Sequence, residues 1–356
     1  MMKSLAVLLT GLMLACPALS GAPLKLEDWV DTQGAKFKAE PVEVLGPIGL
    51  FRTGRTTGRR IPFRFLKEED CVRFRQGLER HEPRAADWAE AKAELSAELK
   101  GRTQQVKDGK LVDADFKGRA EPLLYVVFFV ANGEGGSWDM LGTANGPYWE
   151  LQKKHPGMVE GVMYGLRHSL NEHANMAKTM NLPWLVTDLY AQSNIESLRR
   201  YAPGEGYAMV VLSRQAVPLF SIANPDKETV TQTLGEVLTL LDLLRPENPK
   251  SWPDRAYYEG ALRKAEFAKG KADPFLIGNP LLPEGLRQRK VYHLEATLDV
   301  AADGLVTHAV LSPETPVPEK LAPALVSALK KAVLVPAIEN GSYVPGTYKY
   351  QFHSEP

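Results

Sequence analysis

Residues 121–244 alternate apolar runs of strand length with longer amphipathic segments, and this alternation constrains the fold more than any other feature of the chain. The last two apolar runs are separated by only a short polar turn, which predicts a hairpin. Such an order predicts a central mixed sheet with helices on both faces. The apolar runs are LLYVVFFVA (123–131), MVEGVMYGL (158–166), YAMVVLS (207–213) and VPLFSIA (217–223), and the helical segments are GPYWELQKKHP (146–156), LNEHANMAKTMNL (170–182) and TVTQTLGEVLTLLDLL (229–244).

The N-terminal segment, 1–22, predicts a secretory signal peptide. A lysine precedes an apolar stretch from Leu5 to Ala15, and small residues follow it. No later segment has about 18 uninterrupted apolar residues, so no transmembrane helix is expected in the mature chain. We therefore expect an exported protein, periplasmic or secreted. Lipoprotein anchoring at Cys16 is an alternative, although Leu14 is larger than the residue usual before such a cleavage site.

Residues 23–82 form the first predicted domain. Apolar and polar residues alternate in short runs broken by glycine and proline, a pattern typical of short strands. The series WVDTQGAKFKAE (29–40), LFRT (50–53), GRRIP (58–62) and LKEEDC (66–71) resembles the Sla-type homology domain. That resemblance implies an SH3-like β-barrel.

Two features of this domain could carry chemistry. Five arginines and no acid lie between Phe51 and Arg64, so they could form an anion-binding strand face or a solvated, charge-protected hairpin edge. Cys71 is the only cysteine after the signal peptide, so no intramolecular disulfide can form. A buried apolar role is the simpler interpretation of Cys71, and a reactive thiol is the alternative. The five arginines are Arg52, Arg55, Arg59, Arg60 and Arg64.

Residues 83–120 are predicted to be a connector of one helix and one hairpin. Trp88, Ala91, Leu95 and Leu99 recur at helical spacing, which predicts an amphipathic helix over 85–100. The Asp108-Gly109 pair predicts the turn of a hairpin.

Residues 121–246 carry a resemblance to the thioredoxin-like tryparedoxin and nucleoredoxin branch. Trp138 and Pro147 stand where the motif W-C-x-x-C-x-x-x-x-P places its tryptophan and proline. MNLPWLVTDL (180–189) and the segment from Leu198 to Ser221 are similar to later parts of these enzymes. The resemblance implies a thioredoxin-like α/β sandwich.

The same resemblance implies that the redox chemistry is lost. The positions of the two cysteines are held by Asp139 and Gly142, and the position of the cis-proline by Tyr207. Neither Asp139 nor Gly142 can form a thiolate, so dithiol exchange is not expected. Asp139 could cap a helix, or Trp138, Asp139 and Tyr207 could line a ligand groove that binds without reacting.

The C-terminal part divides into residues 247–288, a proline-rich linker with a short helix over 257–269, and residues 289–356. In the latter, strands flank turns at Asp303-Gly304 and Asn340-Gly341, and PEKLAPALVSALKKAV (318–333) predicts a helix. This β-β-α-β order with VPAIENG (335–341) resembles the C-terminal domain of TonB-type energy transducers. The resemblance implies a small α+β module that could bind protein by strand addition.

The predicted fold class is therefore a multidomain α/β protein. Equal numbers of basic and acidic residues, 43 each, argue against a nucleic-acid partner. His168 and His173 are five residues apart, a spacing that places them on different faces of a helix, so we expect no metal site and no cofactor. The function expected is that of a non-catalytic binding or scaffold protein of the cell envelope, with envelope proteins or peptide segments as partners. A single-thiol redox protein using Cys71, or a binder of anionic polymer through the five arginines, is the alternative.

Overall fold

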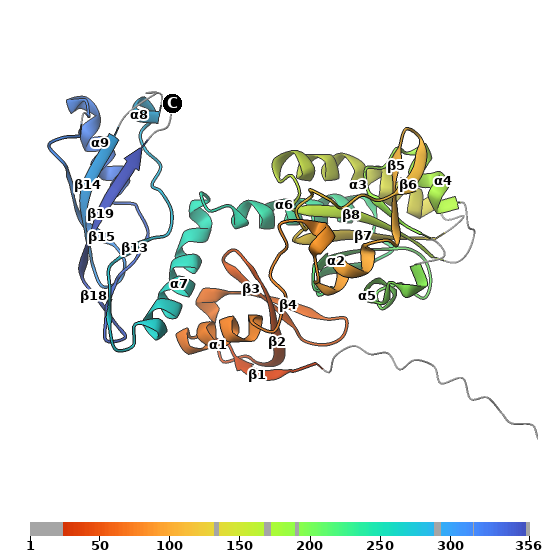
Figure 1. Cartoon of the computed structure of the whole chain (residues 1–356), viewed down its shortest axis with the longest axis horizontal. Helices are drawn as coiled ribbons and strands as arrows, with labels where there is room; N and C mark the ends of the chain where they lie inside the picture. Colours follow the sequence, from red (N-terminus) through yellow and green to blue (C-terminus); the bar gives the residue numbers. More distant parts are fainter. Residues whose placement is uncertain are drawn as a thin grey trace, which may run out of the picture.

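The computed structural model describes residues 24–131, 135–166, 172–188, 192–287, 293–315 and 317–353. The predicted signal peptide, Cys16 and His168 lie outside these residues. Three units follow one another along the chain (Figure 1), and a seven-stranded mixed sheet forms the middle of the largest one. Among the described residues, no helix combines the length and apolar character needed to cross a bilayer.

The central sheet has the order β11-β10-β7-β8-β9-β5-β6. Strands β7 (Leu124–Ala131), β8 (Val159–Leu166) and β9 (Leu185–Thr187) are parallel, and β10 (Ala208–Ser213) pairs antiparallel with β7 and β11 (Pro218–Ala223). Helix α3 (Gly135–Lys154) connects β7 to β8, and α6 (Lys227–Leu244) follows the β10–β11 hairpin. This order of strands and helices agrees with the thioredoxin-like fold that the sequence resemblance implied.

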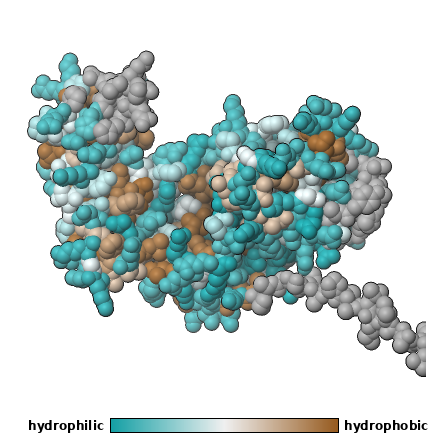
Figure 2. Space-filling model, in the orientation of Figure 1, coloured by the Kyte–Doolittle hydropathy of each residue, from teal (hydrophilic) through white to brown (hydrophobic). Residues whose placement is uncertain are grey.

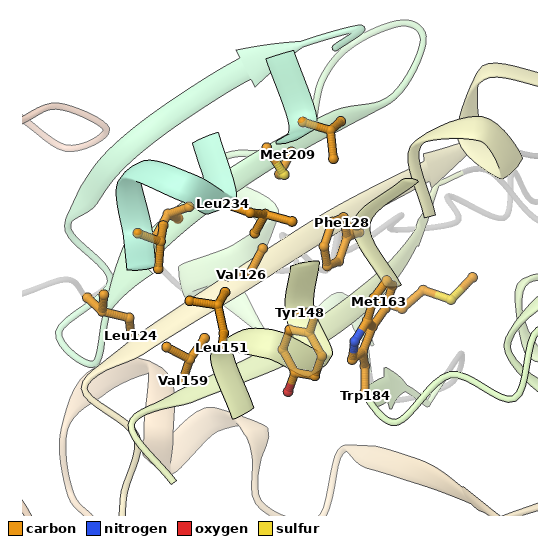
Figure 3. Packing of buried hydrophobic residues seen from close by; sticks show 14 of the residues in the cluster. Leu124, Val126, Phe128, Tyr148, Leu151, Val159, Met163, Trp184, Met209 and Leu234 are labelled. Atoms are coloured by element: carbon orange, nitrogen blue, oxygen red, sulfur yellow. The ribbon is translucent and has the colours of Figure 1, made fainter. Parts of the chain in front are cut away.

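Helices cover both faces of this sheet, as expected. Side chains of α3, α4 (Glu172–Thr179) and α6 pack on one face, and those of α2 (Glu94–Leu99) and α5 (Glu196–Arg199) on the other. Strands β7 and β8 are buried on both faces and consist almost entirely of apolar residues, because each face must contact a helix layer. Figure 3 shows the first of these layers, in which Phe128, Tyr148 and Trp184 meet.

The predicted connector contributes to the central sheet. Strands β5 (Thr103–Lys107) and β6 (Lys110–Asp113) form the hairpin expected at Asp108-Gly109, and β5 pairs with β9. Both turn residues have positive φ, 50° and 69°, as an Asp-Gly hairpin turn requires.

The continuous helix predicted over 85–100 is wrong. A 3-10 turn, Trp88–Glu90, is followed by extended backbone at Ala91 and Ala93 before α2 begins. The four periodic apolar residues are nevertheless buried, between 0 and 1% exposed. The interruption is set by tertiary contacts, because the Leu95 N–H donates to the Arg214 carbonyl and Lys100 Nζ donates to the carbonyls of Ala89 and Ala91.

The N-terminal unit is an antiparallel meander covered by one helix. Strands β1 (Glu27–Val30), β2 (Lys36–Leu45), β3 (Ile48–Arg52) and β4 (Gly58–Pro62) lie in sequence order, and α1 (Glu68–Leu78) packs on β2. Its core includes an aromatic group in which Phe51 meets Trp29 and Phe74 edge to face, with centroids 5.0 and 4.9 Å apart.

Buried charges join this unit to the central one. Arg214, 4% exposed, binds Glu43 of β2 through two nitrogens, at 2.6 and 3.3 Å, and donates to the Glu82 carbonyl at 2.7 Å. Its guanidinium also lies 3.6 Å from Glu121, whose side chain is fully buried. Burial raises the pKa of Glu43, although the hydrogen bond from Arg214 opposes the shift.

Helix α7 (Trp252–Glu266) lies within the predicted linker. It packs on the N-terminal unit through α1 and on the C-terminal unit through β16 (Leu334–Val335). Its Tyr258 stacks on Phe63 at 3.9 Å, and its Lys264 pairs with Glu68 of α1 at 2.5 Å. Lys264 Nζ also lies over the ring of Tyr343 in β18 (Ser342–Val344), 4.5 Å from its centroid, and a Cβ at Gly260, one turn earlier, would lie 2.5 Å from the Tyr343 hydroxyl. On the face shown in Figure 2, hydrophobic residues gather around the position of α7, whereas most of the remaining surface is hydrophilic.

The C-terminal unit has the expected β-β-α-β order with two small additional sheets. Strands β14 (His293–Val300), β15 (Val306–Leu311) and β19 (Gly346–His353) form a sheet with β14 in the middle, and α9 (Ala322–Leu329) covers it. The expected turn at Asn340-Gly341 joins β17 (Ala337–Glu339) to β18. The remaining short elements are α8 (Glu284–Arg287), β12 (Lys271–Ala272), β13 (Phe275–Leu276) and β16 (Leu334–Val335), of which β12 pairs with β17 and β13 with β16.

Candidate functional site

Helix α3 carries four of the five residues that the sequence resemblance matched to the redox motif. Trp138 is 42% exposed, Asp139 and Gly142 are exposed, and Pro147 is half-buried in the middle of the helix. Ser137 Oγ is buried and accepts a hydrogen bond from the Ala131 N–H at 3.1 Å, which joins the helix start to the end of β7. The helix therefore presents an aromatic ring and a carboxylate to solvent near its first turns.

Asp139 is the fifth residue of α3, past the positions at which a carboxylate caps a helix. Its carboxylate instead lies 3.5 Å from Nζ of Lys227, the first residue of α6. Both side chains are about two-thirds exposed, at 65 and 69%, so solvent screens this pair and its contribution to stability is about 0–1 kcal/mol. This pair contributes little to stability. It places one negative and one positive group on the surface near the start of α3.

Tyr207 lies against the start of α3. A Cβ added to Gly136 would lie 2.5 Å from Cζ and Oη of the Tyr207 ring, so the ring occupies the space above this glycine. The Tyr207 backbone is fixed by Asn224, whose Oδ1 accepts from the Tyr207 N–H at 3.0 Å and whose N–H donates to the Tyr207 carbonyl at 2.8 Å. The structure thus brings Trp138, Asp139 and Tyr207, which the sequence singled out, to one end of the sheet.

The contact between Gly136 and Tyr207 can be measured by comparing two neighbouring glycines. A Cβ at Gly135 would meet nothing within 4 Å, and Gly135 is the first residue of α3, so Gly135→Ala should stabilise the chain by less than the roughly 1 kcal/mol of a helix interior. Gly136→Ala should be less favourable by about 1–3 kcal/mol, because the new methyl group displaces the Tyr207 ring. In a Tyr207→Ala background the two substitutions should have equal effects on the free energy of unfolding. Urea unfolding of Gly135→Ala and Gly136→Ala, each with and without Tyr207→Ala, would measure this. Equal effects of the two substitutions when Tyr207 is present would contradict the contact.

The five arginines of the N-terminal unit do not share one surface. Arg52 bonds the Gln215 carbonyl at 2.6 Å and Glu94 at 3.2 Å, and Arg59 pairs with Asp31 at 3.4 Å. Arg60 lies over the ring of Phe220 in β11, 4.2 Å from its centroid, and Arg64 lies 3.7 Å from Asp254 of α7. An anion at this strand would have to compete with three carboxylates, and the geometry favours a role for Arg52, Arg60 and Arg64 in joining this unit to the rest of the chain.

Arg55 lies at the β3–β4 turn and is exposed, as are Arg60 and Arg64. Its carbonyl accepts a hydrogen bond from the Tyr201 hydroxyl at 3.5 Å, and its side chain is not joined to those of the other four.

Cys71 lies in the core of the N-terminal unit and is 0% exposed. Its Sγ is 3.9 Å from the Phe63 carbonyl, and burial together with the neighbouring acids, Asp70 first among them, raises the pKa of its thiol to about 12. A thiol buried in this way is a poor nucleophile, because the thiolate is the reactive species.

We expect Cys71 to react slowly with thiol reagents in the native chain. In a Cys16→Ser variant, labelling by an alkylating reagent at pH 8 should be limited by unfolding, and it should become fast in denaturant. A rise of the pKa from 9.0 to about 12 reduces the thiolate fraction by about a thousandfold, in addition to steric protection. Rapid native labelling would restore the single-thiol hypothesis.

His173 is buried in the central unit. It is 3% exposed, its Nε2 lies 3.2 Å from the Thr187 carbonyl, and burial lowers the pKa of the imidazole. Within the described ranges, no group of three or more histidine, cysteine, aspartate or glutamate side chains is placed to hold a metal ion.

The sequence did not single out four residues at this site. Gly136 and Asn224 position Tyr207, Lys227 pairs with Asp139, and Trp149 is exposed on the same helix as Trp138. The sequence could have indicated Trp149 through its spacing from Trp138. Eleven residues are about three helical turns, which places both tryptophans on the same side of a helix.

No protein-family model matches this sequence, and no curated protein matches it. Several solved structures of thioredoxin-like proteins are each similar to less than half of the chain, at low sequence identity. Tryparedoxin from Trypanosoma brucei is 12% identical, with 37% of this chain and 89% of that chain covered and a TM-score of 0.29. Thioredoxin from Wuchereria bancrofti is 20% identical, with coverage of 40% and 96% and a TM-score of 0.29. A putative thiol:disulfide interchange protein DsbE from Chlorobium tepidum is 13% identical, with coverage of 40% and 94% and a TM-score of 0.29.

Proposed function

We propose that this chain is a non-catalytic binding protein of the cell envelope whose thioredoxin-like unit recognises a protein segment at the start of α3. The observation that carries the proposal is that Trp138 and Asp139 are exposed in the first turns of α3 and Tyr207 packs against Gly136 at the same helix start, with Asp139 and Gly142 at the positions matched to the dithiol. An exposed indole, a phenol ring and an ion pair with Lys227 offer apolar contact and both signs of charge to a peptide.

The flanking units are proposed to add contacts with the same or further partners. The N-terminal meander is proposed to be SH3-like and the C-terminal unit TonB-C-like. In the latter, β15 lies at one edge of its sheet, with β14 as its neighbour, and its Val310 is 51% exposed. An edge strand with an exposed apolar side chain is suited to strand addition by a peptide. Export through the predicted signal peptide would place the protein in the envelope.

Redox catalysis is less well supported. The positions that match the family dithiol are Asp139 and Gly142, and the thiol of Cys71 is buried in another unit. The anionic-polymer alternative would need arginines that are now paired with Asp31, Glu94 and Asp254.

Photocrosslinking in intact cells tests the proposal. A photoreactive phenylalanine at position 138 should give a discrete adduct with another protein, and one at the exposed position Lys269 should not. The 138 adduct should disappear in an Asp139→Ala, Tyr207→Ala double variant and persist in a control variant, Lys107→Ala, on the far hairpin. If the double variant retains every partner at wild-type yield, the cluster at the start of α3 is not a recognition site.

A further inference from the structure

The outer face of α3 carries two exposed tryptophans with two glycines between them. Trp138 and Trp149 are 42 and 54% exposed, and Gly142 and Gly146 are exposed as well. Eleven residues at about 100° each place the two tryptophans within about 20° of one another around the helix, about 16 Å apart along its axis. Gly142 and Gly146 lie on the same side of the helix. The middle of this face therefore has no side chains, and a large indole stands at each end.

No contact within the described chain requires Gly142, because a Cβ there would meet only Met180 Cε at 3.6 Å, an ordinary contact. Gly146 has open space around it, but it precedes Pro147, whose ring disfavours helical backbone in a preceding residue that carries a Cβ. Glycine in a helix interior costs about 1 kcal/mol relative to alanine. Gly142 is therefore the glycine that close approach of something outside this chain explains.

The spacing of the face makes it complementary to itself. Starting from Trp138, the intervals to Gly142, Gly146 and Trp149 are four, four and three residues, so the order reads nearly the same in both directions. When two copies of α3 lie antiparallel about a two-fold axis between the glycines, Trp138 of one copy meets Trp149 of the other, and Gly142 meets Gly146. A two-fold contact of this kind uses the same patch on both subunits.

The charges on α3 also favour the antiparallel arrangement. Asp139 lies near the beginning of the helix, and Lys153 and Lys154 lie in its last turn. Glu150 pairs with Lys154 within the helix at 2.8 Å, whereas no ion pair is present for Lys153 among the residues the structure describes. In this register Lys153 lies four to five residues, about 6–7 Å along the axis, from Asp139 of the second copy, where it could join the exposed pair of Asp139 with Lys227, and parallel copies would bring like charges together.

From this geometry we infer that the chain self-associates as a two-fold dimer through the outer face of α3. Each tryptophan has a surface of about 150–250 Å², so at about half exposure four of them supply on the order of 400 Å². A specific interface buries about 1,000 Å² or more. The four tryptophans supply less than half of this area, and side chains beside them on α3 would have to supply the rest, so we expect a small interface and a reversible dimer. The inference does not rest on the proposed function, but the two share Trp138, and a partner at the start of α3 would compete with the second copy.

Disulfide trapping tests the register directly. In the full chain with Cys16→Ser and Cys71→Ala, a mixture of Gly142→Cys and Gly146→Cys proteins should form the mixed disulfide at least about tenfold faster than either protein alone forms its own. Gly235→Cys, at an exposed glycine of α6, provides the background rate. Equal rates in all samples, or a preference for Gly142→Cys with itself, would overturn the inference.

Sedimentation provides a second measurement that does not use cysteine. The unmodified chain should show concentration-dependent dimerisation in the micromolar range, and Gly142→Arg should abolish it while Gly235→Arg leaves it unchanged. A Cβ at Gly142 would meet only Met180 Cε at 3.6 Å and one at Gly235 nothing within 4 Å, so both variants should fold. A chain that stays monomeric up to about 0.2 mM, well above the expected Kd, would exclude the dimer.

Discussion

Replacing Arg214 by methionine is expected to destabilise the chain by about 3–5 kcal/mol, because the substitution leaves two buried carboxylates without their cation. Arg214 forms a two-point ion pair with Glu43 and lies 3.6 Å from the fully buried Glu121, whose Oε1 has no hydrogen-bond partner in the described chain. Methionine fills a similar volume, so the loss measures the charge and its hydrogen bonds more than a cavity. Urea unfolding followed by far-UV circular dichroism would measure the change in free energy.

The pH dependence of this loss identifies its cause. Burial already raises the pKa of Glu43 in the presence of Arg214, which opposes the shift. Without Arg214 the pKa should rise further, so the folded variant binds a proton that the unfolded chain releases above its ordinary pKa near 4.5. The variant should therefore lose stability as pH rises from about 5 to 8, and the difference from wild type should be smaller at the acidic end.

A surface ion pair provides the matched control. Arg80 and Glu27 are 2.9 Å apart but about one-third exposed, so Arg80→Met should cost no more than about 1 kcal/mol at any pH. An Arg214→Met effect as small as this control would show that the charges between the N-terminal and central units contribute little to their association.

Replacing Trp184 by alanine is expected to cost about 3–5 kcal/mol, the usual range for removal of a buried tryptophan or phenylalanine. Trp184 is 0% exposed, stacks on Phe128 with centroids 4.3 Å apart and meets Tyr148 edge to face at 5.5 Å (Figure 3). Its Nε1 has no hydrogen-bond partner among the described residues, so the loss would be one of packing. Chemical unfolding monitored by the far-UV backbone signal, which is suited to a tryptophan variant, would measure it.

Gly161 offers a compensating change for this core site. A Cβ at Gly161 would lie 2.6 Å from Cγ and Cδ1 of Trp184, so Gly161→Ala should be destabilising alone and tolerated when Trp184 is alanine. Trp149→Ala, which removes an exposed indole of the same kind, should change stability by no more than about 0.5 kcal/mol. A similar cost for Trp149 and Trp184 would contradict the assignment of Trp184 to the core.

Much of the central unit could be predicted from the sequence, because hydrophobic periodicity is a local property. Each apolar run between 123 and 223 contains a strand, and each amphipathic segment between 146 and 244 overlaps a helix. The turns at Asp108-Gly109 and Asn340-Gly341 were also predictable, because few residue types adopt positive φ at low cost. The helix expected over 85–100 was wrong because the Arg214 carbonyl, far along the chain, bonds the Leu95 N–H and helps fix where α2 begins.

The candidate site was predictable in part. The motif placed Trp138 and Asp139 on one helix, and the resemblance placed Tyr207 opposite them. Sequence reasoning could not find Gly136, Asn224 or Lys227, because each matters only through a neighbour far along the chain.

By itself the sequence determined the main strands and helices of the central unit, the turns at Asp108-Gly109 and Asn340-Gly341 and the absence of cysteine from the motif beside Trp138. Only the tertiary structure decided that Arg52 and Arg60 contact the central unit, that Cys71 is inaccessible, and that the 103–113 hairpin extends the central sheet. The physical reason is that backbone conformation and hydrophobic period are properties of a few consecutive residues. The partner of a charge, the burial of a thiol and the neighbour of an edge strand depend on which distant segments pack together.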